Sequence, residues 1–436
     1  MNRTVRALSV ILFFPVVSAI AVPVSDMALD ARSLYVLPDS SIVQDEFLPD
    51  MLEPLPVADA APDESATPAI PANPFPCLPE RASPVEVRAL YLTGWTVGIN
   101  SQLQHYAELA DKTELTAYVV DIKDMDGHIG YKSEIPRVVE IGAFEKRYDP
   151  RKVVDTFHEH NVRVIARIAC FKDPVASSKL PELAVRTKSG ALWKDVKKAT
   201  WLNPYSEKAW AYLVDIAKEA LALGFDEIQF DYVRFPSDGN VRDIDYGKEP
   251  RPKYEAINGF LAYARKEMPD AIISADVFGV MCVSAGDTEG LGQFLELVVQ
   301  NVDYLSPMIY PSHYRLGQVI HKKKYPTPDT EPYAVVSGTL ATAQERIATV
   351  QSCETARIRP YLQDFTAKWL GAGHYKSYEA ADIRAQIKAA KDTGYPEWIL
   401  WNARNRYTES ALAPKKPKTV ALGADLEVRL GEKKRP

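Results

Sequence analysis

The chain has 436 residues, of which 46% are hydrophobic and 10% aromatic, so it can bury the core of one large domain, and a barrel of about 250 residues fits within it. Its formal net charge of -6 at pH 7 offers no basic surface for nucleic acid, so we expect no nucleic-acid partner.

Residues 1–21 have the order of a secretory signal. Arg3 and Arg6 precede an apolar run, and the small residues Ala19 and Ala21 follow it. This order is typical of an exported protein, and the apolar run is short for a membrane span. An uncleaved N-terminal membrane anchor is the alternative. In either case we expect a secreted or periplasmic protein.

Two segments lack the pattern of a folded domain. Residues 22–84 are rich in Pro, Ala, Asp and Ser with no sustained apolar period, and we predict a flexible linker there because such a segment buries too little surface to offset its ordering entropy. Residues 414–436 form a charged tail. The predicted folded unit is therefore 85–413.

Eight short runs within the folded unit have the composition of β-strands. They lie at 87–94, 117–124, 162–170, 227–235, 272–279, 302–310, 358–365 and 398–405. The segments between them have the apolar spacing of helices, with Asp149 and Asn203 each placed as a cap before a proline and Gly224 placed at a helix end. Eightfold alternation of strand and helix predicts a (β/α)₈ TIM barrel, with a doubly wound open sheet as the alternative.

Polar side chains gather near the C-terminal ends of these strands, where the mouth of such a barrel lies. Because side chains alternate along a strand, Gln229 and Asp231 share one side of the fourth strand, and Asp231 falls near its end. The residues predicted at the mouth are Asp121, Lys123, Arg167, Gln229, Asp231, Asp276, Gln363, Asp364, Asn402 and Arg404. A structural ion pair of Asp231 with Arg167 is the alternative for that carboxylate alone.

Aromatic residues are dense after the same strands. They include Trp95, Trp193, Trp201, Tyr310, His313, Tyr314, Trp369, Tyr375 and Trp401. Flat aromatic faces beside carboxylates suit a carbohydrate, whose C–H faces stack while its hydroxyls bind charged groups. We therefore predict a polysaccharide or oligosaccharide substrate that is bound by Trp95, Asp121, Lys123, Arg167, Gln229, Arg234, Tyr310, His313, Gln363 and Trp401.

Glycosidic cleavage needs one protonated carboxyl group and one carboxylate. Asp231 and Asp276 lie at equivalent depths on adjacent predicted strands. Arg167 beside Asp231 favours a charged nucleophile, and the more apolar surroundings of Asp276 favour a general acid. Asp364 is a third predicted catalytic residue, and Asp121 and Asp124 compete with it for the acid or a stabilising role. Retention and inversion of the anomeric configuration both stay open.

Several runs together resemble a bacterial family of glycoside-hydrolase-like proteins of unknown function. They are VRALYLTGWTVG, AYVVDIKDMDGHIGY, VIARIACFKD, WLNPY, GFDEIQFDYVRFPSDG, SADVFG, LSPMIYPSHY and RPYLQDF, within about 85–405. The resemblance implies a TIM barrel distantly similar to α-amylases, and glycosidase activity. Against amylases the chain has Gln229 where they have arginine, Asp276 where the acid is usually glutamate, and Gln363 before Asp364 where they have histidine. Only Asp231 matches their pattern.

Other classes of function have weaker support. Of seven histidines, only His158 and His160 are close, and a spacing of two on a helix points them to different faces. We expect no metal site and no cofactor, although the acidic run DIKDMDG leaves a Ca²⁺ or Mg²⁺ site open. The sequence has no G-x-S-x-G, G-x-G-x-x-G or Walker motif. A non-catalytic carbohydrate-binding barrel of the cell envelope is the alternative function.

The four cysteines show no paired short spacing. They are Cys77, Cys170, Cys282 and Cys353. A zinc or redox motif is therefore not predicted, one disulfide stays open, and we interpret Cys170 and Cys282 as small core residues.

Overall fold

The computed structural model describes residues 69–76, 86–248, 251–350 and 354–415. The predicted signal at 1–21, most of the predicted linker at 22–84 and nearly all of the tail at 414–436 lie outside these residues, as do Cys77 and Cys353. Cys170 and Cys282 are buried free thiols, which confirms their interpretation as core residues. No helix among the described residues is long and apolar enough to cross a membrane.

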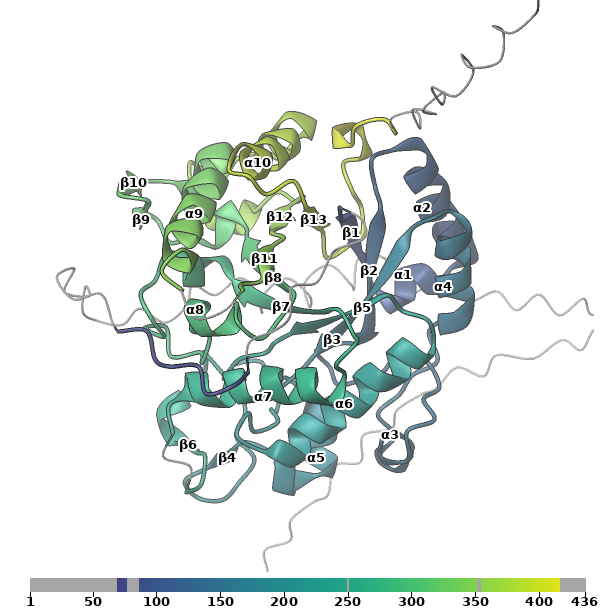
Figure 1. The fold of residues 1–436 in the computed structure, drawn as a ribbon, viewed down its shortest axis with the longest axis vertical. Helices are drawn as coiled ribbons and strands as arrows, with labels where there is room; N and C mark the ends of the chain where they lie inside the picture. Colours follow the sequence, from purple (N-terminus) through teal and green to yellow (C-terminus); the bar gives the residue numbers. More distant parts are fainter. Residues whose placement is uncertain (1–68, 77–85, 249–250, 351–353, 416–436) are drawn as a thin grey trace, which may run out of the picture. The chain divides into compact units, whose positions relative to one another are not determined.

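The strands form a closed parallel barrel (Figure 1), which confirms the predicted fold. Its sheet runs in the order β11-β8-β12-β13-β1-β2-β3-β5-β7, and pairing of β7 with β8 closes it. The strands are β1 (Arg88–Leu92), β2 (Ala117–Lys123), β3 (Arg163–Ala169), β5 (Glu227–Asp231), β7 (Ile273–Phe278), β8 (Tyr304–Ile309), β11 (Arg357–Ile358), β12 (Tyr361–Gln363) and β13 (Trp398–Trp401).

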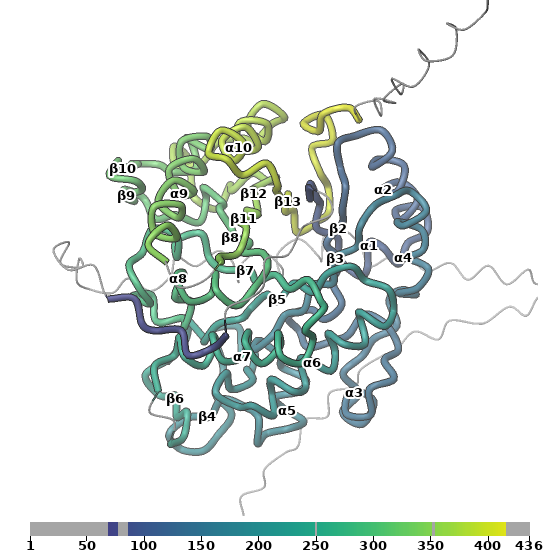
Figure 2. Tube along the Cα trace, viewed as in Figure 1, coloured from purple at the N-terminus to yellow at the C-terminus, as the bar shows by residue number. Residues whose placement is uncertain are grey.

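The helices surround this barrel. They are α1 (Gly94–Gly98), α2 (Asn100–Lys112), α3 (Pro136–Ile141), α4 (Pro150–Glu159), α5 (Pro174–Lys179), α6 (Glu207–Ala222), α7 (Lys253–Glu267), α8 (Leu295–Val298), α9 (Pro332–Ile347) and α10 (Ala380–Asp392). Figure 2 traces α10 beside α9 and α6 beside α7. Two small antiparallel pairs lie in the loops: β4 (Arg186–Thr187) with β6 (Ile244–Asp245), and β9 (Gln318–Ile320) with β10 (Lys323–Tyr325).

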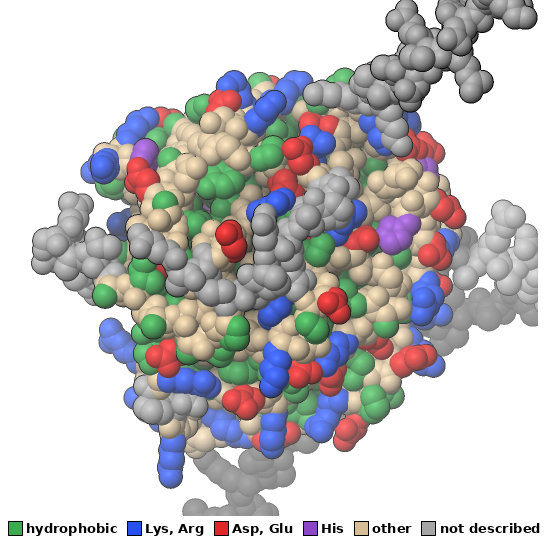
Figure 3. All heavy atoms as spheres, viewed as in Figure 1, with side chains coloured by type: hydrophobic (Ala, Val, Ile, Leu, Met, Phe, Trp, Pro, Cys, Tyr) green, Lys and Arg blue, Asp and Glu red, His purple; other side chains and the backbone are tan. Residues whose placement is uncertain are grey.

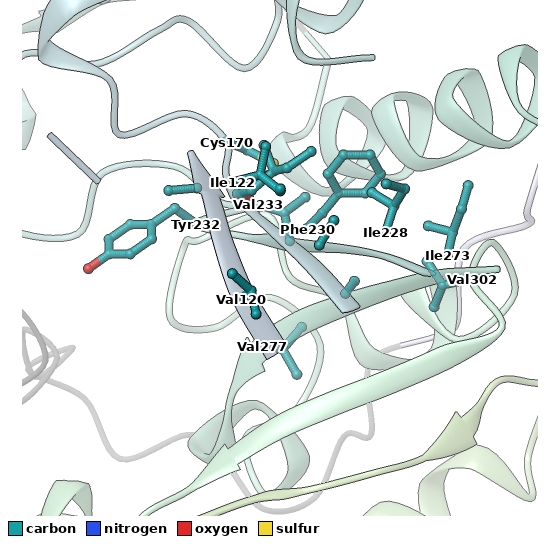
Figure 4. Packing of buried hydrophobic residues seen from close by; sticks show 14 of the residues in the cluster. Val120, Ile122, Cys170, Ile228, Phe230, Tyr232, Val233, Ile273, Val277 and Val302 are labelled. Carbon is teal, nitrogen blue, oxygen red and sulfur yellow. The ribbon is translucent and has the colours of Figure 1, made fainter. Parts of the chain in front are cut away.

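Alternation along the strands divides the core into two layers. Outward residues such as Ile228, Phe230 and Ile273 pack against the helices (Figure 4). The inward residues form a separate cluster inside the barrel: Val87, Ala89, Tyr91, Ala117, Val119, Ile165, Tyr310, Tyr361 and Ile399. This period of two fixes which side chains of each strand can reach the mouth.

Each predicted strand is shorter in the structure than its predicted run, and for two of them the physical reason is evident. β5 ends at Asp231 because Tyr232 adopts a left-handed conformation with φ of 48°, which breaks the extended chain. The predicted run 358–365 is divided into β11 and β12 by Arg359 and Pro360, and proline has no N–H to donate to a neighbouring strand.

One of the two predicted helix caps is confirmed. Asp149 caps α4 by accepting from the backbone N–H groups of Arg151 and Lys152 at 3.1 and 3.3 Å. The cap at Asn203 was wrong, since α6 begins later and Ser206 is its cap. The Asn203 side chain instead accepts from the backbone of Tyr205 at 3.0 Å, in the kind of local turn that competes with helix formation.

A short part of the predicted linker contacts the barrel. Residues 69–76 contain no helix or strand. The side-chain oxygen of Asn73 accepts a hydrogen bond from the Asn258 amide of α7 at 3.2 Å. At least this part of the segment is therefore packed on α7.

The face of the molecule in Figure 3 carries acidic and basic side chains that are interspersed. No single-sign field extends over the side chains visible in this view. This distribution agrees with the modest net charge of the chain.

Candidate active site at the barrel mouth

A buried arginine joins two carboxylates inside the barrel. Asp121 and Arg167 are register partners on β2 and β3, and Asp231 ends the neighbouring strand β5. Arg167 Nη1 donates to Asp121 Oδ1 at 2.5 Å, while its Nε donates to Asp231 Oδ2 at 2.9 Å and its Nη2 donates to the same oxygen. Burial by itself would lower the pKa of Arg167, but the charges of Asp231 and Asp121 raise it well above its ordinary value. The predicted neighbours Asp121, Arg167 and Asp231 therefore meet.

The remaining oxygens of these carboxylates are also hydrogen-bonded. Tyr91 donates its hydroxyl to Asp121 Oδ2 at 2.5 Å, and the backbone N–H of Tyr232 donates to Asp231 Oδ1 at 2.6 Å. Asp231 thus accepts donors at both oxygens, an arrangement that suits a carboxylate anion.

Asp276 has the opposite environment. It lies on β7 one step beyond Ala275, whose register partner on β5 is Phe230, so it stands beside Asp231 on the adjacent strand. Its side chain is 1% exposed, and neither carboxyl oxygen has a hydrogen-bond partner among the described residues. Burial, and next the charge of Asp231, raise the pKa of Asp276 well above its ordinary range. Both effects favour the protonated form of this carboxyl group.

Gln229 sits beneath this pair, deeper in the barrel. It is fully buried, accepts from the Tyr361 hydroxyl at 2.6 Å and donates to Ser306 at 3.4 Å. Gln229 therefore supports the floor of the site, and its amide is occupied by protein groups.

Aromatic rings form one wall, which runs from the barrel interior toward solvent. Tyr310 packs on Trp401 with ring centroids 5.6 Å apart, and His313 lies 5.2 Å from Tyr310. Phe365 follows, and Trp369 stacks on it at 5.8 Å and is 37% exposed. Burial lowers the pKa of His313 to about 3, so this ring is neutral.

Arg234 lies beside the ends of β5 and β7. Its guanidinium carbon is 4.8 Å from the centre of the Phe278 ring, 5.0 Å from that of Trp201 and 5.1 Å from that of Tyr232. Asp231 is also among the charges that influence it. Arg234 makes no hydrogen bond to Asp231; its Nη1 donates to the Phe235 carbonyl and to Ser237 Oγ.

Lys123 does not join the cluster at the mouth. An irregularity in the register of β2 inserts one residue between Asp121 and Lys123, so Lys123 pairs with Ile168, whose side chain faces the outer core. Its ammonium group is fully buried, donates to the Ala169 carbonyl at 2.6 Å and lies 3.0 Å from Asp173.

Gln363 and Asp364 are both bound to loops. Gln363 accepts from Ser312 Oγ at 2.9 Å and donates to Asp329 at 3.0 Å. The carboxylate of Asp364 accepts from the backbone and the hydroxyl of Thr408 at 2.9 and 2.7 Å. The structure does not bring Asp364 into contact with Asp231 or Asp276, so its contacts are those of a loop anchor.

Trp95 lies on α1 and is 54% exposed. Arg147 stacks over its ring at 4.8 Å, and Asp124 holds that arginine through an ion pair at 2.5 Å. Trp95 is thus available to solvent, but it does not contact the Arg167 cluster.

Sequence reasoning missed three residues that shape the site. Tyr91 and Tyr361 bind Asp121 and Gln229 through their hydroxyls, and both occupy inward positions of predicted strands. The available signal for Tyr91 was its position two residues after Ala89 on the same predicted strand, which puts both side chains on the inside of the barrel. Phe365 lies at the end of a predicted strand and gave no separate signal.

Metal ligation has no support in the described part of the chain. No group of three or more His, Cys, Asp or Glu side chains there is arranged to hold a metal ion. His158 and His160, the close pair in the sequence, contact Asp226 and Asp111 separately.

The chain is similar to known families and structures. A family model described as "Putative glycosyl hydrolase domain" matches residues 89–407. No curated protein matches the chain.

Several solved structures are similar to the chain. A hypothetical protein from Ruminiclostridium thermocellum ATCC 27405 is 55% identical, over 43% of this chain and 97% of that one, with a TM-score of 0.42. The PgaB (BpsB) glycoside hydrolase domain from Bordetella bronchiseptica is 14% identical, over 76% of this chain and 100% of that one, with a TM-score of 0.55. The spore cortex-lytic enzyme SleL from Bacillus cereus is 12% identical, over 76% of this chain and 74% of that one, with a TM-score of 0.44. At 14% identity the PgaB likeness shows a shared fold.

Proposed function

We propose, from the premise that the chain belongs to the "Putative glycosyl hydrolase domain" family, that its barrel hydrolyses glycosidic bonds of a polysaccharide. The observation that carries the proposal is the contrast between two carboxyl groups on adjacent strands. Asp231 is held by Arg167 and a backbone N–H, whereas Asp276 is enclosed without a partner in the described chain. Two carboxyl groups in opposite environments match the requirement for one base or nucleophile and one acid.

The proposed chemistry divides between these two residues. Asp276 donates its proton to the glycosidic oxygen as the bond to the anomeric carbon breaks. Asp231 either attacks that carbon, to form a glycosyl-enzyme ester that water then hydrolyses, or removes a proton from an attacking water molecule. Arg167 holds Asp231 in position, and Asp121 on the other side of Arg167 fixes the guanidinium.

The proposed substrate is a sugar polymer because of the aromatic wall. Trp401 and Phe365 are partly exposed, and Trp369 is more so. The exposure of these rings increases from the barrel interior toward solvent. A row of aromatic faces of this kind suits the successive sugar rings of one polysaccharide. Tyr310 and His313 lie behind these rings and support them.

The test is release of reducing ends from a panel of α- and β-linked polysaccharides by the purified full chain. We expect Asp231→Asn and Asp276→Asn each to lower activity on one substrate by about a thousandfold or more, which is roughly 4 kcal/mol of transition-state stabilisation. Asp276→Asn should lose less activity on a substrate whose leaving group needs no protonation, such as a dinitrophenyl glycoside.

Asp392→Asn is the matched control, because Asp392 is an exposed residue of α10 that pairs with Lys388. It should cleave the same substrate at the wild-type rate. If no polysaccharide is cleaved but wild type, Asp231→Asn and Asp276→Asn bind one of them equally well, the non-catalytic carbohydrate-binding barrel replaces the proposal.

We further propose that the enzyme acts in the periplasm or outside the cell. The support is the order of basic, apolar and small residues in 1–21. Fractionation of cells that express the full chain tests this, and recovery of the protein with the cytoplasmic fraction would contradict it.

A further inference from the structure

Arg234 is a buried cation without a counter-ion. Its side chain belongs to a residue that is 6% exposed, and it forms no ion pair with any Asp or Glu in the part of the chain that the structure describes. Burial lowers its pKa from the ordinary arginine value, and the charges of Tyr232, Asp231, Asp238 and Asp195 offset this effect only in part. The contrast with Arg167, which holds two carboxylates, is direct.

Three aromatic rings compensate part of the cost of burying this charge. The rings of Phe278, Trp201 and Tyr232 all lie within 5.1 Å of the guanidinium carbon. Attraction between a cation and aromatic faces is strongest where water is excluded. The rings also fix the plane of the guanidinium, so its N–H groups point in defined directions.

The hydrogen bonds of Arg234 occupy only one of its nitrogens. Nη1 donates to the Phe235 carbonyl and to Ser237 Oγ, each at 3.1 Å. Nε and Nη2 make no hydrogen bond to a described residue, and neither is among the atoms that are fully enclosed without a partner. The Nε–Nη2 edge of the guanidinium is therefore free of hydrogen bonds to the described residues and is not completely enclosed.

This edge has the geometry that recognises a planar carboxylate. Two parallel N–H groups on one side of a guanidinium pair with the two oxygens of a carboxylate. The edge is also close to the proposed catalytic pair, because Phe278 is two residues beyond Asp276 and Tyr232 follows Asp231 directly. A sugar bound between Asp231 and Asp276 would have its substituents near Arg234.

We propose that Arg234 binds the carboxylate of an acidic sugar, so that the substrate is a polysaccharide containing uronic acid or another carboxylated sugar. This inference rests on the proposed function, since it names the class of substrate for the same mouth. The sugar carboxylate supplies the counter-charge that Arg234 lacks in the described chain, which gives the site a preference for acidic over neutral chains.

The direct test is the ¹H–¹⁵N spectrum of arginine Nε–H groups in the full-length protein. The Arg234 resonance is assigned by its absence in Arg234→Lys. Addition of D-glucuronate should shift this resonance, while D-glucose at the same concentration should leave it in place. No shift with D-glucuronate, an equal shift with D-glucose, or a shift with inorganic sulfate alone would each overturn the carboxylate assignment.

A binding measurement with variants separates recognition from folding. Calorimetry with oligogalacturonate should show at least tenfold weaker binding for Arg234→Gln and also for Arg234→Lys, which keeps the charge but lacks the two-pronged edge. The control is Arg88→Gln, because Arg88 begins β1 at the opposite end of the barrel. Equal affinity of wild type and a folded Arg234→Lys would overturn the proposal.

The two proposals can fail independently. If oligogalacturonate shifts Arg234 and is bound but no acidic polymer is cleaved, Arg234 recognition stands and glycosidic cleavage does not. If a neutral polysaccharide is cleaved and D-glucuronate leaves Arg234 unmoved, the hydrolase stands and the acidic substrate does not.

Discussion

Arg167 binds Asp231 through two nitrogens at a single carboxylate oxygen, inside a closed barrel where both residues are less than a tenth exposed. The same guanidinium holds Asp121 on its other side. A buried ion pair contributes little net stability because desolvation offsets much of the attraction. Its position beside Asp276, whose carboxyl oxygens have no hydrogen-bond partner in the described chain, favours a role in orienting Asp231 for chemistry.

Arg167→Gln should be strongly destabilising. It would leave the carboxylates of Asp121 and Asp231 buried without their cation, and breaking a buried pair costs about 3–5 kcal/mol. Urea denaturation followed by circular dichroism measures the change. Arg167→Lys keeps one positive charge and should lose less. A loss below about 1 kcal/mol in Arg167→Gln would mean that water already reaches these carboxylates.

The activity of the enzyme should fall on the alkaline side through Asp276. This group must be protonated to act as the acid, and burial and the charge of Asp231 raise its pKa. The rate should therefore be highest below the raised pKa and decline as pH increases through it. A pH profile of kcat/KM checks this. A rate that shows no decline as pH increases would contradict the assignment of Asp276 as acid, whereas a decline at low pH is expected from protonation of Asp231.

The same residue should make stability depend on pH. Because the pKa of Asp276 is raised on folding, the folded state binds its proton more tightly than the unfolded state does. This contribution to stability is complete below the unfolded value of about pH 4 and is lost, by up to about 1.4 kcal/mol per pH unit, until the folded pKa is reached. Thermal melting of Asp276→Asn should show a smaller decline than wild type over that interval.

A second buried pair, between Glu227 and Arg359, should serve stability alone. Arg359 is fully buried, Glu227 is 1% exposed, and Ser274 also donates to Glu227 at 2.6 Å. These residues lie toward the N-terminal ends of the strands, away from the mouth. Glu227→Gln should cost about 3–5 kcal/mol in urea denaturation, with unchanged kcat for the folded fraction. A large loss of kcat in folded protein would place this pair in the mechanism.

Trp369→Ala should weaken binding of long substrates. Trp369 stacks on Phe365 and is 37% exposed, so it can offer a sugar platform at little cost to the core. Removing one such aromatic contact is worth about 0.5–1.5 kcal/mol, roughly a two- to tenfold rise in KM for long chains. The same variant should leave KM for a short substrate unchanged. Equal effects on both lengths would put Trp369 next to the cleaved bond.

The sequence predicted the barrel and the central site residues for one physical reason. A strict period of two puts every second side chain of a regular parallel strand on the inside, so Asp121, Arg167, Gln229 and Asp231 had to face inward and meet. Eight strand and helix pairs then left few other ways to close the sheet.

That rule fails where the strand is irregular or has ended. Lys123 was predicted at the mouth, but one extra residue in β2 turns it outward to Asp173. Asp364 was also predicted at the mouth together with Gln363, although a period of two places neighbouring residues on opposite sides, and Asp364 binds Thr408. The beginning of α6 depended on whether Asn203 bonded locally or capped the helix, and both bonds are available to an asparagine.

The amino-acid sequence by itself predicted the alternation of strands and helices, the barrel that they favour and most of the inward-facing residues, because these follow from local periodicity and the short range of chain connections. Only the tertiary structure decided that Asp276 has no hydrogen-bond partner in the described chain and that Nε and Nη2 of Arg234 make no hydrogen bond there. Hydrogen bonding and desolvation are set by residues that are far apart in the sequence. Asp231 acts on Asp276, and Phe278 packs against Arg234. Local periodicity cannot predict these contacts.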